Sequence, residues 1–141
     1  LKKIYISSDH AGFKLKEYIK KFFNKKKIFI TDMGPTNDKK TDYPVFAHKL
    51  ARKVCLNKNN RGILVCGSGT GMNITANKHK NVRAAQCFSV KSTKLSRLHN
   101  NANIITLGSR LISKKKACSF IEIFLKTKFE GGRHLKRIRR I

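Results

Sequence analysis

The chain has 141 residues, which suits a single domain that is large enough to bury a core. Hydrophobic residues make up 40% of it and charged residues 28%, and no run of about 18 apolar residues occurs, which excludes a membrane-spanning segment. The formal net charge of +26 predicts attraction to anions, whether nucleic acid, anionic membrane or phosphorylated metabolites. Its lysines are scattered along the chain rather than gathered in a basic stripe, so we interpret most of them as solvated surface and expect no nucleic-acid or membrane partner.

Strand-like and helix-like segments alternate along the chain. Apolar runs predict strands over residues 3–7, 28–30, 62–66, 82–87 and 103–107. Helical spacing of apolar residues predicts helices over residues 15–23, 47–55 and 117–125, and the alternation adds helices over 72–76 and 90–98. The strand over 62–66 is continuously apolar and ends at glycines, as expected of a strand covered on both faces.

This alternation predicts an α/β fold with a parallel five-stranded sheet and helices on both faces. No linker, repeat or low-complexity block interrupts it, so we expect one domain over residues 1–141. In such folds ligands bind at the carboxyl ends of the strands, which directs attention to the loops 7–12, 66–71 and 107–110. The basic segment from about residue 129 is expected to lie outside the domain, where it could contact substrate or a partner subunit.

A glycine-rich loop directly follows the third predicted strand. In Cys66-Gly67-Ser68-Gly69-Thr70-Gly71 three glycines alternate and then open a helix, so backbone N–H groups can approach an anion. The pattern lacks the Gly-Lys-Ser/Thr ending of a Walker A loop, and it follows the wrong strand for a dinucleotide fingerprint. The loop is therefore predicted to bind an anion other than a nucleotide pyrophosphate.

Cys66 stands where that strand meets the loop. A thiol at a helix N-terminus can act as a base or nucleophile, whereas Cys55, Cys87 and Cys118 lie in apolar contexts. The four cysteines show neither a CxxC pair nor metal-ligand spacing, and residues 1–8 resemble a strand rather than a signal peptide. We therefore predict a protein of the reducing cytoplasm, with no metal and no cofactor.

Two histidines and two arginines complete the set of candidate site residues. His10 follows Asp9 after the first strand, and His99 precedes Asn100; we expect the fold to bring these strand ends together. Arg133 and Arg137 are four residues apart, so a helical turn would place both on one side, where two guanidinium groups suit a phosphate monoester. Proton transfer on a phosphorylated sugar needs a base, backbone donors that stabilise an anion, an acid and a phosphate-binding group. The cysteine, the glycine-rich loop, the histidines and the arginines could supply them.

The sequence resembles the family of type B ribose-5-phosphate isomerases and galactose-6-phosphate isomerases. The resemblance runs from end to end through six blocks in order: 8–12 (SDHAG), 42–44 (DYP), 62–78 (GILVCGSGTGMNITANK), 99–103 (HNNAN), 107–110 (LGSR) and 129–137 (FEGGRHLKR). It implies a Rossmann-like three-layer α/β/α sandwich. It also implies an aldose-ketose isomerase of the pentose phosphate pathway, assembled as a dimer or tetramer with active sites between subunits.

The resemblance also implies roles for individual residues. Cys66 matches the general base and His99 the acid that opens the furanose ring. One branch of the family uses a glutamate base, but Met72 occupies that place here, which indicates the cysteine-base branch. The remaining matches concern substrate binding, and they are Asp9, His10, Gly67, Ser68, Gly69, Thr70, Gly71, Asn100, Arg110, Arg133 and Arg137.

The expected substrate pair is D-ribose 5-phosphate and D-ribulose 5-phosphate, interconverted through an enediolate. An isomerase of a six-carbon phosphate, such as allose or galactose 6-phosphate, is the alternative. A basic nucleic-acid-binding protein is a remote alternative that rests on the charge alone and leaves the Cys66 loop unexplained.

Overall fold

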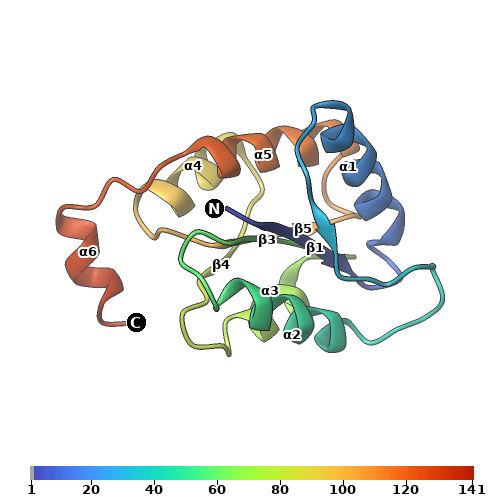
Figure 1. The fold of residues 1–141 in the computed structure, drawn as a ribbon, viewed down its shortest axis with the longest axis horizontal. Coiled ribbons are helices and arrows are strands. Elements are labelled where there is room, and N and C mark those ends of the chain that lie inside the picture. Colours follow the sequence, from blue (N-terminus) through green and yellow to red (C-terminus); the bar gives the residue numbers. More distant parts are fainter. Residues whose placement is uncertain (1) are drawn as a thin grey trace.

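A computed structural model describes residues 2–141 as a three-layer α/β/α sandwich (Figure 1). Its five strands are all parallel, in the order β2-β1-β3-β5-β4. The strands are β1 (Ile4–Ser8), β2 (Thr31–Asp32), β3 (Arg61–Cys66), β4 (Ala84–Gln86) and β5 (Ile104–Gly108). The helices are α1 (Phe13–Lys25), α2 (Tyr43–Val54), α3 (Thr70–Ala76), α4 (Val90–Leu98), α5 (Lys114–Lys126) and α6 (Arg133–Ile138). The predicted Rossmann-like fold is confirmed.

Each face of the sheet has its own core. Along β3, Ile63 and Val65 face the side covered by α1 and α5, whereas Leu64 and Cys66 face α2 and α3. This alternation follows from the two-residue period of a strand, and all four side chains are buried because helices cover both faces. Cys66 therefore belongs to the α2–α3 side of the sandwich.

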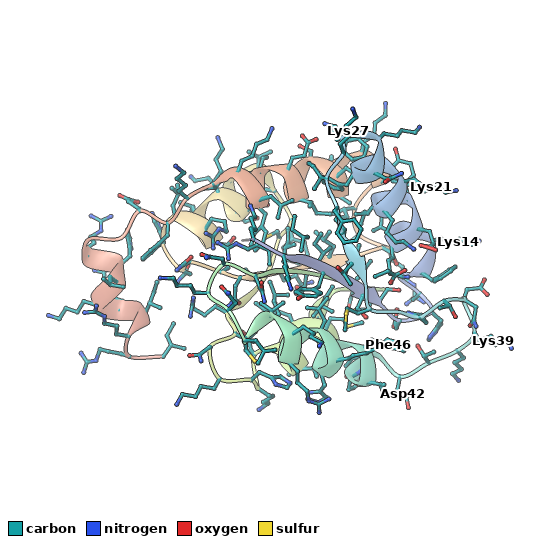
Figure 2. The ribbon with its side chains drawn as sticks, viewed as in Figure 1. Lys14, Lys21, Lys27, Lys39, Asp42 and Phe46 are labelled. Carbon is teal, nitrogen blue, oxygen red and sulfur yellow. The ribbon has the colours of Figure 1, made fainter. Side chains whose placement is uncertain are left out.

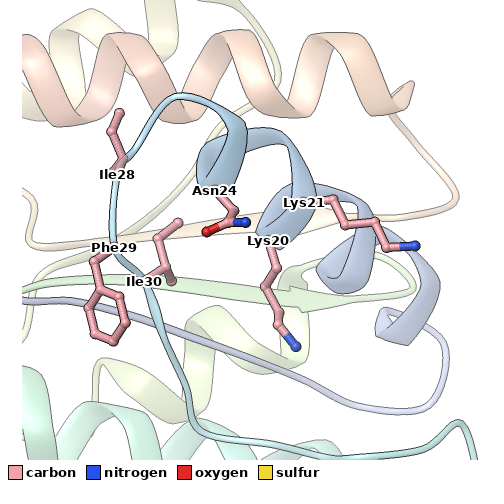
Figure 3. A pocket seen from close by; sticks show the side chains of 6 residues that line it. All are labelled: Lys20, Lys21, Asn24, Ile28, Phe29 and Ile30. Atoms are coloured by element: carbon pink, nitrogen blue, oxygen red, sulfur yellow. The ribbon is translucent and has the colours of Figure 1, made fainter.

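The second strand lies later than predicted. Residues 28–30 are irregular, and β2 is only Thr31–Asp32, paired with Tyr5 and Ile6. The Ile28 N–H still closes the end of α1 by donating to the Phe23 carbonyl, 3.0 Å away, so the chain reaches β1 only three residues later. Ile28 and Ile30 pack on the α1–α5 core, whereas Phe29 points the other way and is 84% exposed (Figure 3).

Most lysines project outward, as the scattered charge predicted. Lys14, Lys21, Lys27 and Lys39 are exposed around the rim of the molecule (Figure 2). Lys16 is the exception, since it is fully buried. Its Nζ donates to the two carboxylate oxygens of Asp32, at 2.9 and 2.8 Å, and to the Pro35 carbonyl at 2.8 Å. This buried ion pair ties α1 to β2.

α6 stands apart from the sandwich, at the left of Figure 1, on the side of the sheet where β1 begins. Within residues 2–141, no helix is both long enough and apolar enough to cross a bilayer.

Candidate active site

Three loops meet at the carboxyl edge of the sheet, where β1, β3 and β5 end. The Asp9 N–H donates to the Val65 carbonyl at 3.2 Å, the Ser109 N–H to that of Cys66 at 2.8 Å, and the Arg110 N–H to that of Gly67 at 3.0 Å. They enclose a cavity of about 330 Å³. It is lined by Asp9, His10, Ala11, Tyr43, Cys66, Gly67, Ser68, Gly71, Arg110 and Leu111. We call this cavity and the loop 66–71 the thiol half-site.

The geometry of the loop requires a glycine at position 69. Gly69 has φ +80°, in the left-handed region that side chains disfavour, and a Cβ there would lie 3.0 Å from the Leu107 carbonyl carbon. A Cβ on Gly67 would lie 2.8 Å from a terminal guanidinium nitrogen of Arg110. The Arg110 cation therefore rests directly on the loop, beside any anion that the loop holds.

Cys66 lies at the inner end of this cavity. Its side chain is 4% exposed, and the Gly69 N–H donates to its Sγ at 3.1 Å, which fixes the sulfur against the loop. Two of the other cysteines have surroundings that favour the neutral thiol. Burial raises the pKa of Cys87, and burial together with the Glu122 carboxylate raises the pKa of Cys118 to about 11. Cys66, unlike these two, lines the cavity at the carboxyl edge of the sheet.

Asp9 and His10 flank the cavity opposite the loop. The Asp9 Oδ1 accepts the Gly12 N–H at 2.9 Å, which closes the turn into α1. The Nδ1 of His10 lies 3.2 Å from the Thr41 nitrogen and 3.1 Å from its carbonyl oxygen. Because the Thr41 backbone engages Nδ1, the His10 ring is fixed and Nε2 is the atom that can serve a ligand.

Gln86 of β4 braces the glycine loop from the side. Its Nε2 donates to the Ser68 carbonyl at 2.5 Å, and its Oε1 accepts the Thr70 hydroxyl at 3.3 Å. No sequence pattern indicates a role for Gln86, since an isolated glutamine in a strand has no characteristic spacing. Tyr43, which packs on the loop at Gly71, lies in the block 42–44 that carried the family resemblance, yet no role was predicted for it.

The structure places the remaining candidates at the opposite edge of the sheet. α4 returns the chain to the edge where strands begin, so His99 and Asn100 precede β5. That edge lies four residues of β3 away from Cys66, about 13 Å at 3.3 Å per residue. The expectation that one chain brings His10 and His99 together is wrong. In a βαβ unit, a residue that follows a strand and one that follows a helix lie at opposite edges.

His99 gathers its own group of residues near α6. Its ring stacks on that of His134, with centroids 4.2 Å apart and planes 14° apart. The Glu130 N–H donates to the Leu98 carbonyl at 3.1 Å, which anchors the segment before α6 to the end of α4. Arg133 and Arg137 both lie in α6, as their spacing predicted. We call His99, Asn100, Arg133 and Arg137 the histidine half-site.

The electrostatics of this half-site are cationic. Burial lowers the pKa of His134, and the charges of His99 and Arg133 lower it further, against an opposing contribution from Glu130. A buried neutral imidazole thus supports the exposed ring of His99. Glu130 and His134 were missed as site residues, although both lie in the block 129–137.

A parallel α/β sheet with a thiol, a glycine-rich loop and a guanidinium group at its carboxyl edge has the parts of a sugar-phosphate isomerase. The Ribose/Galactose Isomerase family model matches residues 4–141, and the chain belongs to that family.

The relatives agree with this assignment. The chain is 37% identical over 141 residues to the ribose-5-phosphate isomerase B of Escherichia coli, covering all of this chain and 95% of that one. It is 41% identical to a probable ribose-5-phosphate isomerase B of Mycoplasma pneumoniae, covering 98% and 91%. A structure of the Mycoplasma genitalium ribose-5-phosphate isomerase B with bound ribulose 5-phosphate superposes with a TM-score of 0.94, at 42% identity, covering 99% and 93%.

Proposed function

We propose that the protein is an aldose-ketose isomerase that interconverts D-ribose 5-phosphate and D-ribulose 5-phosphate. The observation that carries the proposal is the buried Cys66 thiol, fixed by the Gly69 N–H in a cavity that Arg110 flanks. The relative with bound ribulose 5-phosphate supports the substrate. We further propose that it works in the pentose phosphate pathway. Its four cysteines are free, which supports a place in the reducing cytoplasm.

In the proposed mechanism Cys66 is the base that removes the proton from C2 of the open-chain aldose and returns it to C1, while the proton of the C2 hydroxyl moves to the C1 oxygen. The negative charge that develops on the enediolate oxygens is stabilised by backbone N–H groups of Gly67–Gly71. Asp9 and His10 bind sugar hydroxyl groups, and Arg110 lies beside the anion. At the place of the alternative glutamate base stands Met72, which has no carboxylate and is fully buried in the α2–α3 core.

His99 is the proposed acid that opens the furanose ring, and it cannot reach Cys66 of its own chain. We propose that the protein is a homodimer in which the histidine half-site of one subunit completes the thiol half-site of the other. The position of α6 outside the sandwich supports this arrangement, since its arginines are carried beyond the domain that bears Cys66.

Subunit mixing tests the shared site. The variants Cys66→Ala and His99→Ala are each expected to be nearly inactive as pure homodimers. In a mixed two-fold dimer one of the two sites recovers both residues, so a statistical mixture should regain about a quarter of wild-type activity. The measurement is the isomerase rate after subunit exchange by dilution from mild denaturant, with exchange followed by mass spectrometry.

The control is wild-type protein that passes through the same exchange and retains its rate. If mass spectrometry shows the mixed dimer and no activity returns, the shared site is contradicted. The base assignment to Cys66 is tested separately.

Arg137→Ala tests whether this arginine binds the substrate phosphate or only adds to the positive charge of the protein. A charge-assisted hydrogen bond contributes about 1.5–3 kcal/mol, so kcat/KM should fall roughly 10- to 150-fold. Changing the exposed residues Lys25, Lys26 and Lys27 together to Gln removes more charge and should leave kcat/KM within about twofold, because each lies outside both half-sites. Steady-state kinetics on ribose 5-phosphate and allose 6-phosphate make the comparison.

A larger loss of function in the lysine variant than in Arg137→Ala would favour the hypothesis of a nucleic-acid-binding protein. There the lysine variant would lose affinity for duplex or single strands, each lost phosphate contact would reduce the salt dependence by about one unit of slope, and the parent would show no isomerase activity. Greater turnover on allose 6-phosphate would instead favour the six-carbon alternative.

A further inference from the structure

Two imidazoles and one carboxylate meet in the histidine half-site. The potential ligand atoms of His99, Glu130 and His134 all lie within 4.8 Å of one another. The Glu130 Oε2 is 3.7 Å from the Nε2 of His99 and 3.7 Å from the Nε2 of His134. These distances are too long for hydrogen bonds, so the three groups face one another without satisfying one another.

His134 has a buried ring nitrogen without a hydrogen-bond partner in the described part of the chain. Its side chain is 6% exposed, and its Nε2 finds no hydrogen-bond partner among residues 2–141. Leaving a buried polar nitrogen unpartnered is unfavourable, and native proteins seldom do so. A cation placed between the three groups would give His134 a partner and would use Glu130 and His99 as well.

The spacing suits a tetrahedral ion. Zinc holds nitrogen and oxygen ligands at about 2.0–2.2 Å, which separates neighbouring ligand atoms by about 3.3–3.6 Å. Both distances from Glu130 exceed this range by only a few tenths of an ångström. The stacked rings must converge, which a tilt of the 37% exposed His99 side chain allows. Glu130 is 54% exposed, so the fourth position stays open to water.

We propose that His99, Glu130 and His134 bind Zn²⁺, and that the bound ion inhibits the isomerase by occupying His99. The inhibition rests on the proposed function, in which His99 opens the sugar ring, whereas the binding does not. Arg133 and Arg137 oppose a cation here, so the ion binds less tightly than in a resident zinc site and is reversible. The phosphorylated substrate, which the same arginines attract, competes with it.

Direct binding tests the site without reference to activity. Competition with a chromophoric chelator should show one Zn²⁺ per chain, while Mg²⁺, which prefers oxygen ligands, should not displace it. Glu130→Gln and His134→Gln should each weaken binding by more than the roughly 10- to 100-fold that the loss of an outer-shell partner costs. His79→Gln is the matched control and should leave the zinc affinity unchanged. The Nε2 of His79 lies 2.7 Å from the Nδ1 of His48, and among the described residues this histidine pair has no carboxylate beside it.

Inhibition is then measured relative to each variant's own zinc-free rate. Zinc should raise the apparent KM of the wild type and should inhibit Glu130→Gln only at correspondingly higher concentration. If the wild type binds no zinc, or if binding survives both substitutions, the site is overturned; loss of that binding in Cys66→Ala would then place the zinc at the thiol half-site. Binding without inhibition of an active enzyme overturns the inhibitory role. A zinc-free wild type that is inactive on ribose 5-phosphate would count against the proposed function while leaving the binding result intact.

Discussion

Cys66→Ala is expected to abolish isomerisation while leaving substrate binding largely in place. The substitution removes the proposed base and keeps the glycine loop, whose backbone is held by Gln86 and Arg110. Loss of a general base costs roughly 10²–10⁴-fold in rate. The measurement pairs the turnover rate with the affinity for ribose 5-phosphate from calorimetry, and near-normal turnover in the alanine variant would refute the role.

Alkylation supplies an independent measurement of the same residue. Iodoacetamide should inactivate the protein, and substrate should slow the inactivation because Cys66 lines the cavity in which we propose that substrate binds. Cys55 is partly exposed and would also react, so the experiment uses a Cys55→Ala background. In that background Cys66→Ala should take up no further label in the native state, since Cys87 and Cys118 are 1% exposed and burial raises the pKa of both thiols.

Asp32→Asn is expected to lower the free energy of unfolding by about 3–5 kcal/mol, because it leaves the charge of the fully buried Lys16 without its carboxylate. Chemical denaturation at neutral pH makes the measurement. Lys20→Met is the control: it removes the 32% exposed partner of the same carboxylate and should cost no more than about 1 kcal/mol. A loss for Asp32→Asn as small as that of the control would show that the buried pair contributes little.

The pH dependence of the same variant has a definite sign. Burial raises the pKa of Asp32, but hydrogen bonds from Lys16, Lys20 and the Gly34 N–H outweigh it and hold the pKa below its usual value. A carboxylate with a lowered folded-state pKa stabilises the fold above its unfolded pKa of about 3.9, and that stability is lost as the pH falls through the folded value. The difference between wild type and Asp32→Asn should therefore narrow below about pH 4.

The sequence predicted the sandwich well because the cores of an α/β fold are local patterns. The run over 62–66 and the helical spacing over 117–125 each specify an element with no information from elsewhere in the chain. The glycine loop was recognisable for the same reason, since its residues are contiguous. Its place at the carboxyl edge of the sheet then followed from the topology of the fold.

The errors concern features that depend on distant residues. The position of β2 is set by where α1 ends, and an apolar run over 28–30 does not reveal that. Lys16 can be buried because the carboxylate of Asp32, sixteen residues later, neutralises its charge and accepts its hydrogen bonds. The misplacement of His99 arose from pairing strand ends without following the return of α4, and Gln86 acts on a loop that neighbours it only in space.

In the homodimer proposed above, the division of the site between opposite edges of the sheet has a genetic consequence. When a defective copy is produced beside the normal one, a chain that has lost only Cys66 or only His99 spoils one site of each mixed dimer and leaves the other intact. A chain that has lost both spoils the two sites together, even though its partner is normal. With equal amounts of both chains, such an allele beside a normal one would leave about a quarter of wild-type activity, whereas a single lesion beside a normal copy would leave about half.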